Sequence, residues 1–435
     1  MRILLISANR EPFPEPVFPI GLAYVAGSLE RSGVEVRIFD MRHGSTSSLQ
    51  KEITRFRPDR IGISLRNVDN AAYPFFRFYL PSYLTLIQSV RAVIDVPVVL
   101  GGSAFSLFPE EINAYLKADG GLKGDGEGFY EFLCSEGEGK IATAERCQME
   151  TIGFPKNIAG VFPDFRRYRT IGIQTARGCA NRCIYCSYPF LEGRSRRTRP
   201  PERIVEEIAS LHRNFSVTNF FVVDSLFNGE ESHMVQVLDR LAALNLRVRI
   251  SCYLQPKISD PSIFRLMKKA GCVVVDFGTD SGSSSLLSSL RKPFTTDDIR
   301  AVSRACRQEG IDHCHSLIFG GPGETESTIQ KTVDLMDEVS PRAVIAMTGI
   351  RIYPFTEMEQ IALNEGIISR GDSLFEPRFY FPKMGQSLLR EKVRRAVAGR
   401  NNWFFPGEKD WSASWGYRLL GFFYRKGPLW RTFRQ

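Results

Sequence analysis

The sequence predicts an α/β protein made of two parallel-sheet units and a mainly helical C-terminal extension. Short apolar runs alternate with helical patterns over residues 1–135, the alternation stops over 136–170, and it resumes over 171–370. Strands that alternate with helices favour parallel sheets covered on both faces. Residues 371–435 are rich in aromatic and basic side chains. A chain of 435 residues is long enough for two to three domains of this kind.

The first unit is expected to be a doubly wound, Rossmann-like parallel sheet. The predicted strands cover residues 2–7, 34–40, 60–65 and 96–100, and helical patterns cover 20–31 and 83–93. Ligands of such sheets bind at the carboxyl ends of the strands. We therefore expect the turns after three of these strands to meet at one edge, namely 7–9, 64–67 and 101–103.

The second unit repeats the alternation after a segment that we interpret as a linker. Residues 136–170 mix Gly, Glu, Lys and Pro without sustained periodicity. The strand candidates that follow are 171–177, 219–224, 247–254, 272–279, 314–319 and 345–353. Six repeats fall short of the eight in a closed (β/α) barrel. Pro201 is expected at the first turn of a helix, where its missing N–H costs nothing.

Composition indicates a soluble globular protein. Hydrophobic residues make up 43% and charged residues 24% of the chain. No apolar run approaches membrane-spanning length, and the N-terminal apolar run is too short for a signal peptide. The nine cysteines have irregular spacing, which fits a reducing compartment. We therefore expect a cytoplasmic protein, and a monomer.

Three cysteines in one loop are the strongest chemical signal in the chain. Cys179, Cys183 and Cys186 have the spacing C-x3-C-x2-C and follow an apolar segment. Three thiolates would bind three irons of a [4Fe–4S] cluster and leave one iron open to a small molecule. A structural zinc site is the alternative, but it needs a fourth ligand, and the next candidate is His212. A disulfide is disfavoured because three is an odd number.

With Tyr185 directly before the third cysteine, this loop resembles the signature of the radical S-adenosylmethionine (SAM) superfamily. The resemblance implies a partial (β/α)6 barrel and a [4Fe–4S] cluster on Cys179, Cys183 and Cys186, with SAM on the fourth iron. One-electron transfer would cleave SAM to methionine and a 5′-deoxyadenosyl radical, so the cofactor would supply the difficult chemistry. A reduced flavodoxin- or ferredoxin-type electron donor is implied as well.

The resemblance also implies SAM contacts at the ends of the later strands. Asp224 and Ser225 follow the second strand, and Asp280 follows the fourth, although many relatives have Glu at that last position. Strand-end capping is the alternative for these residues. Further expected contacts are Tyr185, Gly320, Pro322 and Arg351, with Gln255 facing the cavity. Residues 318–325 look like the superfamily's glycine–proline turn, and Thr325, at its end, is a candidate helix cap.

A second resemblance covers the first unit. The segments 19–24, 33–36, 62–64, 101–102, 109–110 and 124–127 follow one another as in the cobalamin-binding domain found ahead of many radical SAM cores. The implied cobalamin contacts are Ser64, Leu65, Arg66, Asn67, Gly101, Gly102, Ser103 and Glu127. The family's histidine loop is missing after the first strand, and His43 has the wrong spacing, so we expect cobalamin without histidine ligation. The alternative is a vestigial domain kept for packing or substrate binding.

The positive charge of the chain is concentrated in its last part. The net charge is +9, and residues 389–435 hold eleven Lys/Arg against three acids. All four tryptophans lie there too: Trp403, Trp411, Trp415 and Trp430. We interpret 371–435 as a lid that caps the substrate and shields a radical from water. A membrane-surface patch is the second interpretation.

The basic run at 194–199 has two interpretations. It could hold nucleic acid phosphates, or it could be a solvated or cofactor-facing loop. The second is favoured because similar arginines follow the cluster loop in the family that the chain resembles. No nucleic acid partner is therefore expected.

Together, the two resemblances imply a cobalamin-dependent radical SAM enzyme. The expected activity is C-methyl transfer from methylcobalamin to an unactivated carbon of a small molecule. The alternatives are an oxidative cyclase or rearrangement enzyme that uses cobalamin without methylation, and a non-catalytic iron–sulfur protein that binds a membrane or nucleic acid. A methylthiotransferase is disfavoured, because those enzymes carry three more N-terminal cysteines and none precedes Cys134 here.

Overall fold

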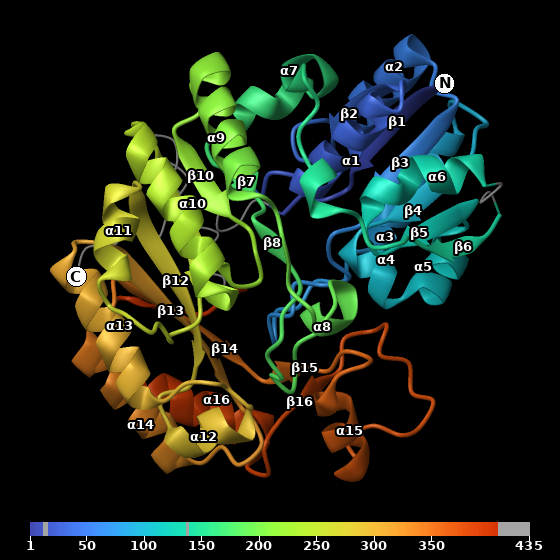
Figure 1. The fold of residues 1–435 in the computed structure, drawn as a ribbon. Helices are drawn as coiled ribbons and strands as arrows, with labels where there is room; N and C mark the ends of the chain where they lie inside the picture. Colours follow the sequence, from blue (N-terminus) through green and yellow to red (C-terminus); the bar gives the residue numbers. More distant parts are fainter. Residues whose placement is uncertain (12–15, 136–138, 408–435) are drawn as a thin grey trace. The chain divides into compact units, whose positions relative to one another are not determined.

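The computed structural model describes residues 1–11, 16–135 and 139–407 (Figure 1). The chain divides into two compact units, and we describe each by itself. The first comprises residues 1–70 and 78–172, and the second comprises residues 71–77 and the chain from 173 onward. No helix among the described residues is long and apolar enough to cross a membrane.

The first unit is a six-stranded sheet in the order β2-β1-β3-β4-β5-β6, and all of its strand pairs are parallel. Its strands are β1 Arg2–Ser7, β2 Glu35–Asp40, β3 Arg60–Ser64, β4 Val98–Gly101, β5 Gly120–Lys123 and β6 Ile141–Thr143. Its helices are α1 Ile20–Arg31, α2 Thr46–Phe56, α3 Leu80–Arg91, α4 Ser103–Leu107, α5 Pro109–Leu116, α6 Phe129–Cys134 and α7 Ile158–Val161, with 3-10 turns η1 Gly126–Gly128, η2 Met149–Thr151 and η3 Pro163–Arg167. The predicted Rossmann-like sheet is confirmed.

The stretch interpreted as a linker contributes to this first unit. Its strand β6 pairs with β5 at the edge of the sheet. Phe162 and Phe165 are fully buried, and the centroid of each ring lies 5.9 Å from that of Phe18. These residues therefore pack as part of a hydrophobic core.

The second unit contains a seven-stranded sheet in the order β17-β14-β13-β12-β11-β10-β7, and its pairs from β10 to β17 are parallel. Its strands are β7 Ile171–Ile173, β10 Asn219–Val222, β11 Arg249–Leu254, β12 Cys272–Asp280, β13 Asp312–Phe319, β14 Ala343–Thr348 and β17 Trp403–Phe404. Its helices are α8 Tyr188–Leu191, α9 Pro201–Phe215, α10 Glu231–Leu244, α11 Ile263–Lys269, α12 Ser284–Ser289, α13 Thr296–Gln308, α14 Glu326–Val339, α15 Glu357–Asn364 and α16 Gly385–Ala396, with the 3-10 turn η4 Phe227–Gly229. Two short antiparallel pairs complete it, β8 Ala176–Arg177 with β9 Arg197–Thr198, and β15 Ile350–Arg351 with β16 Phe379–Tyr380. The six predicted strands are present.

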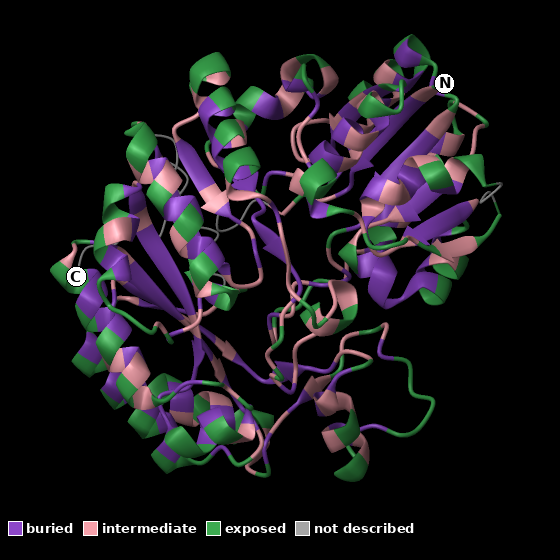
Figure 2. Ribbon diagram, in the orientation of Figure 1, coloured by how far each residue is buried: buried purple, intermediate pink, exposed green. Residues whose placement is uncertain are grey.

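Both sheets are buried, as Figure 2 shows by the purple colour of their strands. Parallel strands covered by helices on both faces lie away from water, which explains the nearly continuous apolar runs of inner strands such as β1, whereas the edge strand β2 alternates between buried and more exposed residues. Pro201 begins α9 as predicted. The carboxyl ends of the strands carry the turns that were expected to bind ligands.

The described part of the C-terminal extension belongs to the core of the second unit. Helix α16 buries Leu389 and Val393 in the same hydrophobic cluster as Trp403, and β17 extends the sheet beside β14. Trp403 and Phe404, which we assigned to the lid, are therefore core residues. The other three tryptophans of the predicted lid lie outside the described residues.

Candidate active site

A short hairpin encloses the loop that carries the three cysteines. Strands β8 and β9 pair on either side of the loop, at Ala176 with Thr198 and Arg177 with Arg197. Gly178 begins the loop with a φ of +91°, and a Cβ there would lie 2.2 Å from the carbonyl oxygen of Ser195. Only glycine fits this close backbone approach, so the hairpin fixes both ends of the loop.

The three cysteines lie together in this loop as free, half-buried thiols. The backbone amide of Cys179 donates to the carbonyl of Gly193 (3.1 Å), and that of Cys186 donates to the carbonyl of Cys183 (3.2 Å). Burial raises the pKa of the Cys183 thiol, and it raises that of Cys186 to about 12. Burial therefore favours the neutral thiols, and bound iron is what would hold them as thiolates.

The donor set, three thiols of one loop, is of the kind that holds an iron–sulfur cluster. Across the residues that the structure describes, no three His, Cys, Asp or Glu side chains converge closely enough to hold one metal ion. A [4Fe–4S] cluster makes a different demand, because each of its thiolates binds a different iron. Three thiols spread along one loop meet that demand.

A buried group of three polar side chains lies next to the cysteines. The Tyr185 hydroxyl donates to the carboxylate of Asp280, and the Lys292 ammonium lies 2.8 Å from the same carboxylate oxygen. The side chains of Lys292 and Asp280 are 8% and 5% exposed. Burial works to lower the pKa of Lys292, but the charge and hydrogen bond of Asp280 together with the charges of Cys183 and Cys186 outweigh it, and the pKa lies above its ordinary value.

The backbone at Asp280 is strained. Its φ is +63°, and the pairing of β12 with β13 shifts register between Gly278 and Asp280. A left-handed conformation costs a non-glycine residue on the order of 1–3 kcal/mol and clusters at functional sites. In this conformation the carboxylate of Asp280 contacts Tyr185 and Lys292.

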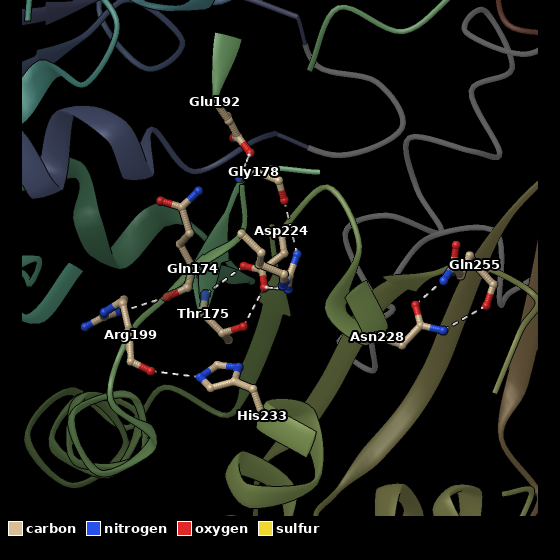
Figure 3. Close-up of polar contacts among 10 residues, drawn as sticks. Gln174, Thr175, Gly178, Glu192, Arg199, Asp224, Asn228, His233 and Gln255 are labelled. Atoms are coloured by element: carbon tan, nitrogen blue, oxygen red, sulfur yellow. Dashed lines mark hydrogen bonds and ion pairs between the residues drawn. The ribbon is translucent and has the colours of Figure 1, made fainter. Parts of the chain in front are cut away.

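Asp224 is fully occupied by neighbouring groups of the same unit. Its carboxylate accepts from the backbone amide (2.7 Å) and hydroxyl (2.5 Å) of Thr175, as Figure 3 shows, and forms a 3.2 Å ion pair with Arg196. Burial raises the pKa of Asp224, and the charge of Arg196 opposes that rise. The residue predicted to contact SAM therefore anchors β7 and the end of the cysteine loop.

Ser225 differs from its neighbour. Its hydroxyl oxygen is buried but has no hydrogen-bond partner among the described residues. A buried polar atom without a partner is costly in a protein interior, which makes it a marker for a missing ligand or water. Of the two residues predicted after β10, Ser225 is the one with unused bonding capacity.

Asn228 and Gln255 connect the ends of two strands to the cysteine loop. The side-chain amide of Asn228 donates to the carbonyl of Gln255 and accepts from its amide, both at 3.0 Å (Figure 3). It also donates to the carbonyl of Lys257 (3.0 Å). Asn181, in the cysteine loop, donates to the side chain of Gln255 (3.0 Å). Gln255, which was expected to face the cavity, is thus in contact with the cysteine loop.

The glycine–proline turn lies beside the end of β13. Gly320 has a φ of +109°, and its amide donates to the buried carboxylate of Glu324 (3.0 Å). The carbonyl of Pro322 accepts from the hydroxyl of Ser289 (2.7 Å). Thr325 caps α14, as its sequence position suggested, through a capping box with Thr328.

Arg351 and the basic run have partners within the second unit. The Arg351 guanidinium donates to the carbonyls of Ile352 (2.5 Å) and Leu374 (2.8 Å) and stacks over the ring of Tyr353. Within the run 194–199, Arg196 pairs with Asp224, and Arg199 is buried in an ion pair with Glu207 (3.0 Å). His233 donates to the carbonyl of Arg199 (2.8 Å; Figure 3). Arg196 and Arg199 therefore have structural partners next to the cysteine loop.

The first unit brings two predicted turns together at the carboxyl edge of its sheet. Ser64 pairs with Gly101, and the amide of Leu65 donates to the carbonyl of Gly101 (2.8 Å). Gly102 has a φ of +96°, and a Cβ there would lie 2.6 Å from the carbonyl oxygen of Leu65. The Ser103 hydroxyl donates to the carbonyl of Arg66 (2.7 Å). Backbone groups therefore hold the two turns side by side.

The remaining residues predicted around cobalamin, and His43, have partners within the first unit. Tyr83 donates to the carbonyl of Asn67 (3.0 Å). Glu127 is buried in η1, after β5, and its carbonyl accepts from Ser28 (3.0 Å). His43 follows β2 and lies against the ring of Tyr168, 5.1 Å between centroids, so its ring is used in packing.

Sequence reasoning missed Lys292, the cation of the buried group. It lies twelve positions after Asp280, between α12 and α13. A lysine among polar residues has no signature in sequence, since most such lysines are solvated. Only the fold brings it to the cysteine loop.

Comparison with family models agrees with this architecture. Residues 7–133 match the B12 binding domain, and residues 173–336 match the radical SAM superfamily. The fold and these two matches define a radical SAM enzyme that carries a B12-binding domain.

Its relatives include methyltransferases at low identity. The chain is 23% identical to tryptophan 2-C-methyltransferase of Streptomyces laurentii, over 81% of this chain and 73% of that protein. It is 24% identical to an uncharacterized methyltransferase of Pyrococcus horikoshii, over 85% of this chain and 84% of the relative. The methyltransferase TsrM of Kitasatospora setae, solved with cobalamin and a [4Fe–4S] cluster, has the same fold, with a TM-score of 0.79, 23% identity and 93% coverage of both chains. A second TsrM structure holds tryptophan and a SAM analogue.

Proposed function

We propose that this protein is a cobalamin-dependent radical SAM methyltransferase that methylates an unactivated carbon of a small molecule. The carrying observation is the set of three free thiols in one loop, enclosed by the β8–β9 hairpin at the carboxyl edge of a parallel sheet. The bound cofactors would supply one-electron cleavage of SAM and a transferable methyl group. The protein's own residues bind and orient them.

The second unit would hold the cluster and SAM. Cys179, Cys183 and Cys186 are the proposed iron ligands. Ser225 is the proposed SAM contact with the best support, because its buried hydroxyl has no partner among the described residues. Gly320 and Pro322 would support the adenosyl group through backbone atoms. Asp224 and Arg351 would position their surroundings, since their polar atoms already have partners.

The first unit would hold the corrinoid by shape. Gly101 and Gly102 have no side chain, so a flat ligand could approach their backbone closely. The turn at 64–67 contains no histidine, and the His43 ring packs on Tyr168. We therefore propose that cobalamin binds without histidine ligation, with Ser64, Leu65, Arg66 or Asn67 covering its lower face.

We propose the following division of labour along the chain. Residues 1–135 would bind the corrinoid, and 171–370 would carry out radical chemistry. Of residues 371–435, the part that does not pack into the core with α16 and β17 would cap a small-molecule substrate; the substrate held by the Kitasatospora enzyme is tryptophan. A reduced flavodoxin- or ferredoxin-type protein would supply electrons to a monomeric enzyme.

The first experiment asks which metal the protein holds. The chain is purified without oxygen, supplied with iron and sulfide, and analysed for metal content and for 5′-deoxyadenosine formed from SAM under reduction. We expect about four irons per chain and release of 5′-deoxyadenosine. Zinc in place of iron would overturn the proposed function.

The second experiment separates methyl transfer from other radical reactions. The protein is loaded with hydroxocobalamin, and bound corrinoid is measured by absorbance. SAM labelled in its methyl group is then supplied together with a small-molecule extract. Corrinoid uptake with label in a small molecule is the expected result. A protein that produces 5′-deoxyadenosine but takes up no corrinoid would contradict the methyltransferase assignment alone.

A further inference from the structure

Lys292 is a buried cation that the fold turns toward the cysteine loop. It follows α12, where Arg291 adopts a left-handed conformation with a φ of +55°. The amide of Lys292 then donates back to the carbonyl of Leu287 (2.8 Å). At this same helix end, the carbonyl of Leu290 accepts from the amide of Ile184, between two of the cysteines (3.4 Å). The lysine and the loop are therefore tied to one another through backbone bonds.

Several neighbours hold the ammonium group of Lys292 in place. It lies 2.8 Å from a carboxylate oxygen of Asp280 and 3.4 Å from the hydroxyl of Tyr185. It also lies over the rings of Tyr185 (5.8 Å) and Phe294 (5.5 Å), at distances typical of cation–π contacts. With 8% of its side chain exposed, the charge is fixed and poorly screened by water.

The ammonium group lies beside the part of the loop that joins two cysteines. Tyr185, whose hydroxyl lies 3.4 Å from the ammonium group, stands between Cys183 and Cys186 in the chain. Hydrogen bonds to cluster sulfurs and nearby charge are two of the factors that set the reduction potential of an iron–sulfur cluster. Reduction adds an electron, and a nearby cation stabilises the added charge most strongly where water is excluded.

We propose that Lys292 raises the reduction potential of the cluster by placing a fixed positive charge beside the loop segment between Cys183 and Cys186. The inference rests on the proposed function, in that these cysteines hold a [4Fe–4S] cluster. Asp280 would lower the reduction potential, since it is an anion next to the lysine. Tyr185 would keep both side chains in place through its hydroxyl group. Lys292 is then a positioning and tuning residue, and it need not touch the substrate.

The test measures the midpoint potential of the cluster itself. Anaerobically reconstituted full-length protein, without SAM, is titrated with a chemical reductant while the reduced cluster is followed by electron paramagnetic resonance. One electron from the titrant takes the cluster from its 2+ to its 1+ state. For a one-electron couple, about 59 mV corresponds to a tenfold change in equilibrium. A purely structural lysine would change the amount of cluster bound without changing the potential of the cluster that remains.

Two substitutions of opposite sign make the test specific. Lys292→Gln removes the charge but keeps a hydrogen-bond donor, and we expect the potential to fall by about 59 mV or more. Asp280→Asn removes the opposing anion, and we expect the potential to rise. Lys292→Arg keeps the charge and should stay near the wild type. Lys269→Gln, which removes an exposed lysine of α11, is the matched control and should have no effect.

Each outcome decides the question. A fall with Lys292→Gln and a rise with Asp280→Asn support the inference. If Lys292→Gln does not keep a cluster, an unchanged potential in Asp280→Asn overturns it, and a rise supports it. Unchanged potentials in both variants, with a normal cluster in the wild type, overturn this inference and leave the proposed function standing. A wild type that binds no iron–sulfur cluster overturns both.

Discussion

The two sheets of this chain end in edges built by different means. In the first unit, the turns after β3 and β4 are joined by backbone hydrogen bonds and by the close approach of Gly102 to Leu65. In the second unit, the loops after the strands are joined by buried charges, Asp224 with Arg196 and Asp280 with Lys292. One edge is fixed by shape and the other by electrostatics.

This difference matches what each edge is proposed to bind. A large flat corrinoid needs an open surface with few protruding side chains, which glycine provides. A cluster and SAM carry concentrated charge, and fixed cations and anions in a dry environment act on them more strongly than in water. Stability and ligand binding at the first edge should therefore fall when side-chain volume is added, and those at the second edge should fall when a charge is removed.

The largest expected effect is on the cysteine loop. Cys183→Ala removes one iron ligand, and we expect loss of the iron–sulfur absorbance and no measurable 5′-deoxyadenosine, because two thiolates do not hold the cluster in place. Iron content per chain is the measurement. Cys134→Ala, at an exposed cysteine of the first unit, is the matched control and should keep both properties. Full iron content in the Cys183 variant would show that the ligands lie elsewhere.

The next effect tests the charges of the second edge. Asp224→Ala leaves Arg196 buried without its carboxylate and removes both bonds to Thr175. Removing one partner of a buried ion pair costs about 3–5 kcal/mol. The measurement is the urea concentration at the midpoint of unfolding of the second unit, compared between the variant and the wild type. Asp239→Ala, at an exposed aspartate of α10, should change the free energy of unfolding by less than about 0.5 kcal/mol. Equal effects in the two variants would argue that the ion pair contributes nothing.

The first edge should instead respond to a single methyl group. Gly102→Ala combines a positive φ with a Cβ that would lie 2.6 Å from a backbone oxygen, and we expect a loss of roughly 2–4 kcal/mol together with weaker corrinoid uptake. Gly33→Ala is a matched control, because Gly33 also has a positive φ (+76°) but nothing within 4 Å of its Cβ position. The control separates backbone strain from crowding. If both variants take up hydroxocobalamin equally, crowding at this turn is not what shapes the site.

Sequence patterns predicted most of this fold, and their misses have physical causes. The observed bounds of β1 and α1 are the predicted ones, since an apolar run and a helical period are local signals. Strand β5 was missed because Gly120 and Gly121 weaken the strand signal. Strand β17 was assigned to the lid, because two aromatic residues in a basic tail do not indicate in sequence that they pair with the edge strand β14.

The site could be predicted only where it is local in sequence. The three cysteines lie within one loop, so their spacing alone indicates the chemistry. The partners of Asp224 are Thr175 and Arg196, 49 and 28 positions away, and no spacing rule connects them. The turns at 64–67 and 101–103 could be placed at one edge because parallel strands have a fixed direction. Which polar atoms stay available for a ligand, as at Ser225, needs the packed structure.

The smallest expected effect concerns acid stability of the second unit. Burial lowers the pKa of His313, in β13, to about 4, and its Nε2 has no partner among the described residues. Because the folded pKa lies below the unfolded value of about 6.5, the unfolded chain binds more protons between these two values. The stabilisation is therefore complete above about pH 6.5 and is lost as the pH falls toward about 4.

Between pH 7 and pH 5, this group should cost the wild type about 2 kcal/mol of unfolding free energy. His313→Gln removes the titrating ring, so its urea midpoint should depend less on pH over that interval, even if it is lower throughout. The measurement is the difference in pH dependence between the two proteins, which cancels the contributions of other buried groups. Parallel pH profiles would mean that His313 accepts its proton in the folded state. The interior of the second unit would then admit water, and charges such as Asp280 and Lys292 would be screened more strongly than the proposed electrostatic role of this edge assumes.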